Sequence, residues 1–262
     1  MFSLLQIEWL KVKKYSTFWI LICIFTALLF GWNYMVSSGI LKLGQGDMNI
    51  LNLNYTFPLV WGNVAYWTKF FSGLIAIIII ILTTNEYQFR TNRQNVIDGW
   101  KREQFYHAKW GIVVVLSLGV TLLSTLIGFF FGLVYGSPIA SAGTNIVNMF
   151  YVLLITLNYF GFALTLSLLL KRSGMTVIIF LLYLYIVEIM LQKLLDWKIG
   201  SSAGSMLPMQ CSADLVGFPM MDSFKKMMPV SGPSNQVLAI VSVCWIVAYY
   251  IIGRIKMLKS DW

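Results

Sequence analysis

Long apolar runs alternate with short polar stretches along this chain of 262 residues. The sharpest junction joins an uncharged run, Phe71–Thr83 (FSGLIAIIIIILT), to the strongly polar stretch Asn85–Lys109. With the apolar residues before it, this run is long enough for a helix that crosses a bilayer, which needs roughly 20 residues for about 30 Å of hydrocarbon. An apolar rod that ends in a basic, polar segment is typical of a membrane-spanning helix.

Six segments have this length and hydropathy. Their apolar residues are continuous rather than alternating, which argues against a transmembrane β-barrel. The pattern therefore predicts an all-α integral membrane protein with six transmembrane helices, forming a single domain over residues 1–262. The predicted spans lie near Thr17–Val36, Val64–Thr84, Trp110–Tyr135, Ile146–Leu170, Met175–Leu195 and Gln236–Ile252.

Residues 1–14 precede the first span and carry apolar side chains at helical spacing. Lys11 and Lys14 are expected to face away from this apolar stripe, with Glu8 at its edge. A helix with these two faces lies along a membrane surface, and the alternative is a short disordered tail. The stripe consists of Phe2, Leu5, Trp9 and Val12.

Residues 196–235 form the last connection, and they are too apolar for a plain solvated linker. Met and Phe residues recur there among Asp and Lys. We expect a short helix or a re-entrant segment at the outer rim, because irregular backbone at membrane depth is tolerated where protein covers it. Cys211 lies in this connection, and it is the candidate among three cysteines for external redox chemistry; the three show no metal-binding spacing.

Composition and charge agree with a membrane location. The chain is 58% hydrophobic and 11% charged, whereas soluble domains are about 25% charged. Its net charge of +9 could suggest nucleic acid, but the cations flank apolar spans. Lipid headgroups and membrane topology explain them better, so no nucleic-acid partner is expected.

The distribution of Lys and Arg predicts the orientation. With the N-terminus inside, the inner segments hold 13 of the 19 basic residues and the outer segments hold five. This bias follows the positive-inside rule, so both termini are expected to be cytoplasmic. The remaining cation, Lys69, falls near the start of the second span, and Glu188 falls inside the fifth.

Ionisable residues inside a membrane are costly and mark a pathway or a pair. By residue count, Lys69 and Glu188 both lie toward the outer third of the bilayer. We therefore predict that they interact near an outer gate and belong to a translocation path. In the alternative, Lys69 extends to the outer interface while Glu188 bonds a neighbouring Tyr or a backbone group.

The polar stretch Asn85–Lys109 carries the richest signal. Thr91-x-x-Gln94 resembles a capping box, and Gly99 would end a short helix through Val96 and Ile97. Trp100 and nearby aromatics alternate with charges. Apolar anchors among charges are what a protein docking surface needs; the alternative is a solvated loop that only sets topology. The single histidine, His107, is expected to be polar surface without a metal or catalytic role.

The chain contains no G-x-x-x-x-G-K-[ST] motif, so it does not bind ATP through a P-loop of its own. No nucleophile elbow, zincin motif or paired carboxylates stand out, and we expect no enzyme activity on this chain. Any energy for transport would come from an ion gradient or from a separate subunit.

The whole layout resembles a type-2 ABC transporter permease, the transmembrane subunit of a bacterial ABC exporter. The stretch NEYQFRTNRQNVIDGWKREQFYHAK (residues 85–109) is similar to the corresponding loop of bacterial permeases in that family. The resemblance implies a coupling helix at Thr91–Gly99 that docks on a separate ATPase, with Glu86 in the junction that transmits motion. The implied ATPase-coupling residues are Glu86, Arg90, Thr91, Arg93, Gln94, Val96, Ile97, Asp98, Gly99 and Trp100.

The resemblance also implies partners and a location. Two copies of a P-loop ATPase would carry ATP and Mg, with no cofactor on this chain, and a second permease half, identical or homologous, would complete the transporter. Spans two and five would line the path near the dimer axis. The chain would sit as a multi-pass protein in contact with lipid in the bacterial cytoplasmic (inner) membrane, exporting an amphipathic peptide, lipid or related cargo.

Two other functions remain open. One is an ion-coupled secondary transporter, which would need more intramembrane ionisable residues and internal repeats. The other is a membrane immunity or scaffold protein that binds a partner without transporting anything.

Overall fold

The computed structural model describes residues 2–40, 55–89, 91, 101–135, 138–199, 202–218 and 232–259. Within these residues the chain is helical, and six helices are long and apolar enough to cross a membrane, which confirms the predicted fold class. Those six are α2 (Ser16–Ser37), α3 (Leu59–Gln88), α5 (Arg102–Val134), α6 (Val147–Leu170), the continuous helix Ser173–Ile199 and α11 (Asn235–Lys259).

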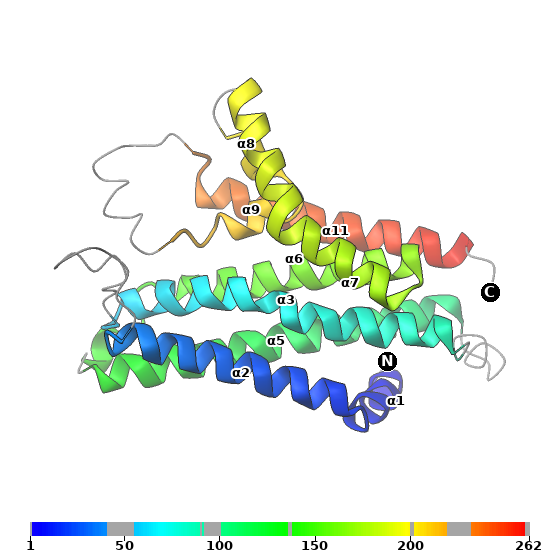
Figure 1. Ribbon diagram of the computed structural model, residues 1–262, viewed down its shortest axis with the longest axis horizontal. Helices are drawn as coiled ribbons and strands as arrows, with labels where there is room; N and C mark the ends of the chain where they lie inside the picture. Colours follow the sequence, from blue (N-terminus) through cyan, green and yellow to red (C-terminus); the bar gives the residue numbers. More distant parts are fainter. Residues whose placement is uncertain are drawn as a thin grey trace.

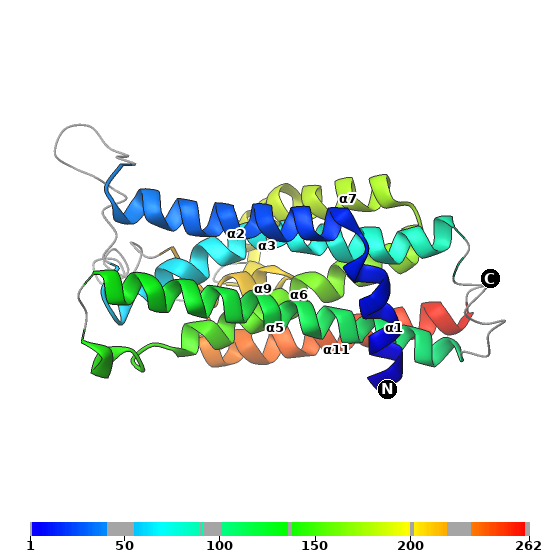
Figure 2. The same ribbon diagram turned by 90° about the horizontal axis from the view of Figure 1, so that it is seen from below.

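The long helices run roughly side by side along the bundle (Figure 1). A shorter helix, α1 (Phe2–Lys13), lies across one end of it, close to α5 (Figure 2). The C-terminal end of α11 lies at this same end of the bundle. We call it the basic end, because α1 and α11 both finish there with lysines in their last turns.

Helix α6 forms the centre of the bundle, in contact with α3, α5, α7 and α11. In its most apolar window 72% of the residues are buried, against 22% in α2, α11 and Ser173–Ile199. Small residues such as Gly161 and Ala163 on α6 allow close helix approach, as is common where membrane helices pack. The peripheral helices therefore present apolar faces outward, whereas α6 exposes large apolar side chains only near its ends.

The fifth span is a composite helix. It consists of α7 (Ser173–Leu182), a π-helical turn η2 (Tyr183–Val187) and α8 (Glu188–Ile199). A π turn inserts an extra residue into the helical repeat and is frequent at functional sites. Here it directly precedes Glu188 and stands where α8 leaves the bundle at an angle (Figure 1).

Two helices are longer than the predicted spans, because polar residues continue the helix beyond the apolar run. Helix α3 begins at Leu59 and continues to Gln88, and α5 already begins at Arg102. The stretch predicted as a polar loop, 85–109, is therefore helical at both its ends. Hydropathy alone could not detect these turns, because they are polar and stabilised by tertiary contacts.

The predicted rim segment is partly described. After α8, the chain forms a 3-10 turn η3 (Gly204–Met206) and a short helix α9 (Gln210–Ala213), while 219–231 lies outside the described residues. Helix α9 packs against α6, α8 and α11. The expected short helix is therefore present in this part, and its location at the outer rim stays a prediction. A further 3-10 turn, η1 (Ile139–Ser141), precedes α6.

Close packing at Gly132 on α5 gives a test of this bundle. A Cβ atom at Gly132 would overlap the buried ring of Phe57, whereas one at Gly119 on the same helix meets nothing within 4 Å. Overpacking a well-filled site costs about 1–3 kcal/mol. We expect Gly132→Ala to lower the thermal midpoint of the purified protein in detergent and Gly119→Ala to leave it unchanged or higher. Equal midpoints for both variants would contradict this packing.

Candidate functional site

Four charged side chains from three helices meet at the basic end of the bundle. Lys109 on α5 lies 2.6 Å from Glu8 on α1 and 2.8 Å from Glu86 on α3. Lys11 on α1 completes the group, at 3.0 Å from Glu8 and 3.1 Å from Glu86. We call these four residues the ion cluster.

The ion cluster is buried and its formal charges cancel. The side chains of Lys109 and Glu8 are each only 2% exposed, and that of Glu86 is 9% exposed, while Lys11 reaches the surface. Isolated charges in such a place would cost several kcal/mol each. Two carboxylates and two ammonium groups in direct contact remove most of that cost.

The pKa of Glu8 shows the balance of these effects. Burial acts to raise it, but attraction to Lys109 and Lys11 and their hydrogen bonds outweigh burial, so the pKa falls below its ordinary 4.5. A lowered carboxyl pKa means that Glu8 stabilises the docked helix α1 above that ordinary value. The contribution is lost as the pH falls through the lower, folded-state value.

Helix α1 differs in orientation from the prediction. It is helical, as expected, and Val12 is buried, but Trp9 remains 47% exposed. The placements of Glu8 at the stripe's edge and of Lys11 facing away from it are wrong, because both turn inward toward charges on α3 and α5. Helical spacing could not show this, since the partners come from distant parts of the chain.

The ion cluster brackets the predicted coupling segment. Glu86 lies in the last turn of α3, before that segment, and Lys109 lies in the second turn of α5, after it. Thr91 is helical and exposed, with its Oγ1 3.5 Å from the Glu86 carbonyl oxygen. The other predicted ATPase-coupling residues, Arg90, Arg93, Gln94, Val96, Ile97, Asp98, Gly99 and Trp100, lie outside the described residues.

After the predicted coupling segment, α5 begins with an N-terminal cap that was not predicted. The Lys101 backbone N–H donates to Gln104 Oε1 at 3.0 Å, so this pair caps α5. The predicted Thr91–Gln94 capping box lies outside the described residues and stays a prediction.

The first turns of α5 are also fixed to the end of α11. The Arg102 guanidinium donates to the Leu258 carbonyl at 3.0 Å, and the Tyr106 hydroxyl donates to the Tyr250 carbonyl at 2.6 Å. His107 lies 2.7 Å from the Tyr250 hydroxyl and stacks on its ring. The expectation that His107 is polar surface is therefore wrong: it packs α5 against α11.

Away from the basic end, Lys69 and Glu188 do not pair with each other within the described structure. Glu188 accepts hydrogen bonds from the backbone N–H groups of Met209 and Gln210, at 2.7 and 3.1 Å. Lys69 donates to the carbonyl oxygens of Ala213 and Val216, at 3.0 and 2.8 Å. The predicted Lys69–Glu188 ion pair is thus replaced by two separate contacts to one segment.

These contacts follow the polarity of α9. Free N–H groups at a helix start favour a carboxylate, and free carbonyls at its end favour an ammonium group. Glu188 occupies the first place and Lys69 the second, so the two intramembrane charges hold α9 from both sides. The alternative in which Glu188 bonds backbone is confirmed, while Lys69 contacts protein rather than extending to the interface.

Cys211 in α9 is buried, and its Sγ lies 3.4 Å from the Ser242 hydroxyl of α11. Cys211, the candidate for external redox chemistry among the three cysteines, is thus not accessible from outside the described fold. Among the described residues, no group of three or more His, Cys, Asp or Glu could hold a metal ion.

The second and fifth spans meet beside these charges. The Tyr185 hydroxyl, in η2, donates to the Phe70 carbonyl of α3 at 2.6 Å. On the same face of α3, a Cβ atom at Gly73 would come within 2.7 Å of the Tyr185 hydroxyl oxygen. The π turn and the missing side chain together bring the two predicted path helices into contact.

Residues 4–188 match the family model described as ABC-2 family transporter protein. The chain belongs to the ABC-2 transporter family. The match covers the ion cluster, both flanks of the predicted coupling segment, and Glu188 at its last residue. No curated protein matched the chain.

Family membership makes this chain a transmembrane permease of the ABC-2 class, a multi-pass membrane subunit that in general works with an ABC ATPase and is not itself catalytic. The resemblance seen in the sequence is therefore confirmed at the level of the family.

The ion cluster of this ABC-2 permease is the feature that sequence reasoning missed. Of its four residues, only Glu86 has a functional role predicted from the sequence, and only through the resemblance. The contact between Glu86 and Lys109 could have been predicted from the sequence. The two residues lie close to the two ends of the polar stretch 85–109, and antiparallel helices bring such ends together. Glu8 carried no such signal, being separated from Lys109 by 101 positions.

Removing Lys109 tests the ion cluster in the ABC-2 permease. Lys109→Met leaves two buried carboxylates with only the partly exposed Lys11, and breaking a buried pair costs about 3–5 kcal/mol. We expect a large fall in the thermal midpoint in detergent. Adding Glu8→Gln and Glu86→Gln to Lys109→Met should recover much of it.

The matched control is Arg254→Met, which removes the exposed ion pair between Arg254 and Glu103 at the same end. It should change the midpoint little, since exposed pairs contribute little. A similar effect of Lys109→Met and Arg254→Met would show that the ion cluster is not a stabilising element.

The contacts to α9 can be tested by hydrogen exchange. Lys69→Met removes two charge-assisted hydrogen bonds, each contributing about 1.5–3 kcal/mol. Backbone amides of residues 213–216 should then exchange at least about tenfold faster. Lys193→Met, at an exposed position on α8, is the control and should leave them unchanged; unchanged exchange in Lys69→Met would refute the role of Lys69.

Proposed function

We propose that this permease is the membrane half of an ATP-driven exporter, which moves an amphipathic peptide, lipid or related cargo out of the cytoplasm or inner leaflet. Two copies of a separate ATPase would bind ATP and Mg, and a second permease half, identical or homologous, would complete the path. The basic end would face the cytoplasm of a bacterial cell, at its cytoplasmic (inner) membrane. The 13 to five distribution of basic residues supports this orientation.

The observation that carries the proposal is that the ion cluster joins the two flanks of residues 90–100, with Glu86 before them and Lys109 after them. A docking segment can drive transport only if its displacement reaches the spans. Lys109 joins both flanks of this segment to each other and to α1 through contacts of 2.6–2.8 Å. A push on the segment would therefore move the ends of α3 and α5 and helix α1 as one unit.

Motion of α3 would next reach the fifth span. Helix α3 contacts Tyr185 in η2 through the Phe70 carbonyl and through the close approach at Gly73. A π turn is a place where a helix can change its repeat without breaking. Rigid-body movement of α3 against this turn would convert ATP-driven closure into a change between inward-open and outward-open arrangements.

Lys69 and Glu188 are proposed to lie along the translocation path. Both project from the helices assigned to that path, and both hold α9, away from the ion cluster. Displacing α3 or α8 would therefore displace α9, which is proposed to act as the outer gate. An aromatic content of 16% favours a cargo with both apolar and polar parts.

Co-purification tests the proposed function. The tagged permease, expressed in its native host, should co-purify with a P-loop ATPase in detergent. The assembly should hydrolyse ATP in a vanadate-sensitive manner, with stimulation by an amphipathic cargo. Isolation without an ATPase under conditions that keep the permease folded would favour a scaffold or secondary transporter. An ATPase partner without cargo stimulation or transport would favour a non-transporting complex.

The ion cluster supplies a variant for the same assay. Glu86→Gln should keep the ATPase bound but reduce cargo transport per ATP hydrolysed by about tenfold, the effect of losing roughly 1.4 kcal/mol of coupling. Glu103→Gln, which alters the exposed pair at the same end, should keep transport near the original level. Equal coupling in both variants would refute transmission through the ion cluster.

A further inference from the structure

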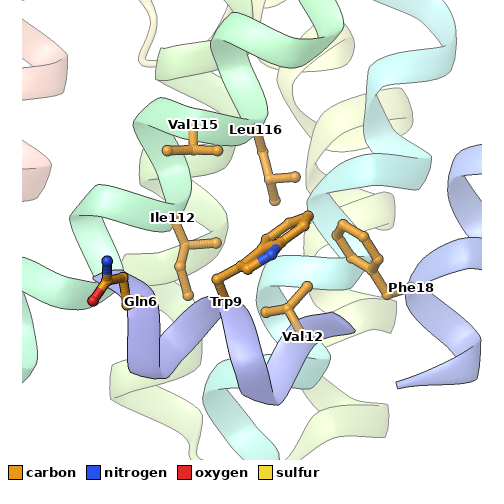
Figure 3. A pocket seen from close by; sticks show the side chains of 7 residues that line it. All are labelled: Gln6, Trp9, Val12, Phe18, Ile112, Val115 and Leu116. Carbon is orange, nitrogen blue, oxygen red and sulfur yellow. The ribbon is translucent and has the colours of Figure 1, made fainter. Parts of the chain in front are cut away.

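An apolar pocket of about 270 Å³ lies between α1, α2 and α5 at the basic end. Gln6 on α1 is the single polar residue in its wall. Figure 3 shows the Trp9 ring extending from α1 between Leu116 and Phe18, with Ile112 and Val115 of α5 to the left of it. The apolar wall consists of Trp9, Val12, Phe18, Ile112, Val115 and Leu116.

The pocket opens sideways, toward the surroundings of the bundle. Trp9 is 47% exposed and Val115 is 50% exposed, so the wall that they form is not covered by the described protein. Helix α1 lies across the end of the spans, where an interfacial helix meets the acyl chains of one leaflet. The molecules that reach this opening in a membrane are lipids.

Two lysines lie where α1 ends and the turn to α2 begins, between the wall residues Val12 and Phe18. Val12 in the wall is followed directly by Lys13 and Lys14, which are exposed and have no carboxylate partner among the described residues. The Trp19 indole N–H donates to the Lys13 carbonyl oxygen at 3.0 Å and fixes the turn that carries them. Lys11 points the other way, into the ion cluster.

We propose that this pocket binds one acyl chain of an anionic phospholipid, with the lipid phosphate at Lys13 and Lys14. A volume of about 270 Å³ is slightly below the range of roughly 300–1,000 Å³ for drug-sized ligands, which suits a single chain rather than a bulky ring system. The apolar wall accepts the chain, and the lysines select the headgroup.

The headgroup must provide the selectivity. Lipid tails are as apolar as the pocket wall, so moving a chain from the bilayer into the pocket gains little from the hydrophobic effect. Each lysine close to an anionic membrane surface favours it by on the order of fivefold. Lys13 and Lys14 would thus select a lipid with a negatively charged headgroup, and the pocket would hold its acyl chain.

A bound chain would fill the space between α1 and α5 on the side of α1 away from Lys11. Helix α1 would then be held by the ion cluster on one side and by lipid on the other. The inference does not depend on transport or on an ATPase, so its failure would leave the proposed function untouched.

The test measures lipid retained by the purified protein. The full chain is equilibrated in detergent with equal amounts of palmitoyl-oleoyl phosphatidylglycerol and palmitoyl-oleoyl phosphatidylcholine, washed, and analysed by native mass spectrometry. We expect the retained lipid to saturate at one phosphatidylglycerol per chain, in preference to phosphatidylcholine.

Two pairs of variants separate the chain site from the headgroup site. Leu116→Trp fills the pocket and should lose the retained lipid, while Leu122→Trp, on the exposed surface of the same helix, should keep it. The double variant Lys13→Gln, Lys14→Gln should lose at least about tenfold of the preference for phosphatidylglycerol. Lys256→Gln with Lys259→Gln, exposed lysines at the same end on α11, should preserve the preference.

Several results would overturn the proposal. They are equal retention of the two lipids by the unaltered chain, retention of a molecule that is not a phospholipid, or the same lipid binding in Leu116→Trp and Leu122→Trp. The lysine variants alter exposed side chains only, so they test the site even if Leu116→Trp fails to fold. Equal preference in the two double-lysine variants would also refute the headgroup assignment.

Discussion

Lys109 places a positive charge where water does not reach, and the arrangement of the basic end follows from neutralising it. Carboxylates from α1 and α3 contact it, and Lys11 balances the second negative charge. This requirement determines where α1 can dock, because Glu8 contacts Lys109 only when α1 lies across the end of the bundle. It also joins the two flanks of the predicted coupling segment, since Glu86 and Lys109 lie on those flanks.

The same constraint is met differently around α9. Glu188 is buried and Lys69 is partly buried, and they bond backbone groups of α9 and its flanking residues instead of each other. A short helix with free groups at both ends offers partial charges of both signs, so it can serve two ionised side chains at once. The basic end is therefore held by side-chain pairs, and the α9 region by main-chain dipoles.

The sequence was sufficient for the spans because hydropathy over roughly 20 residues is a local property. The helical character of α1 was also local. The contacts of Glu8 and Lys11 were not, since a helical wheel shows which face is apolar but not which distant charge will meet it. For Lys69 and Glu188, equal depth in the membrane suggested a pair. The π turn and the return of the chain as α9 supplied nearer partners, and neither feature has a recognisable pattern in the sequence.

Helix α11 joins two separate parts of the permease. In its first half, Ser242 packs on Cys211 of α9, and Trp245 donates to the Met206 carbonyl. In its second half, the carbonyls of Tyr250 and Leu258 accept hydrogen bonds from α5. From Ser242 to Leu258 these contacts extend about 24 Å along the helix. Because one rigid helix connects the surroundings of α9 to the basic end, a cross-link that immobilises either part is expected to restrict the other at a distance.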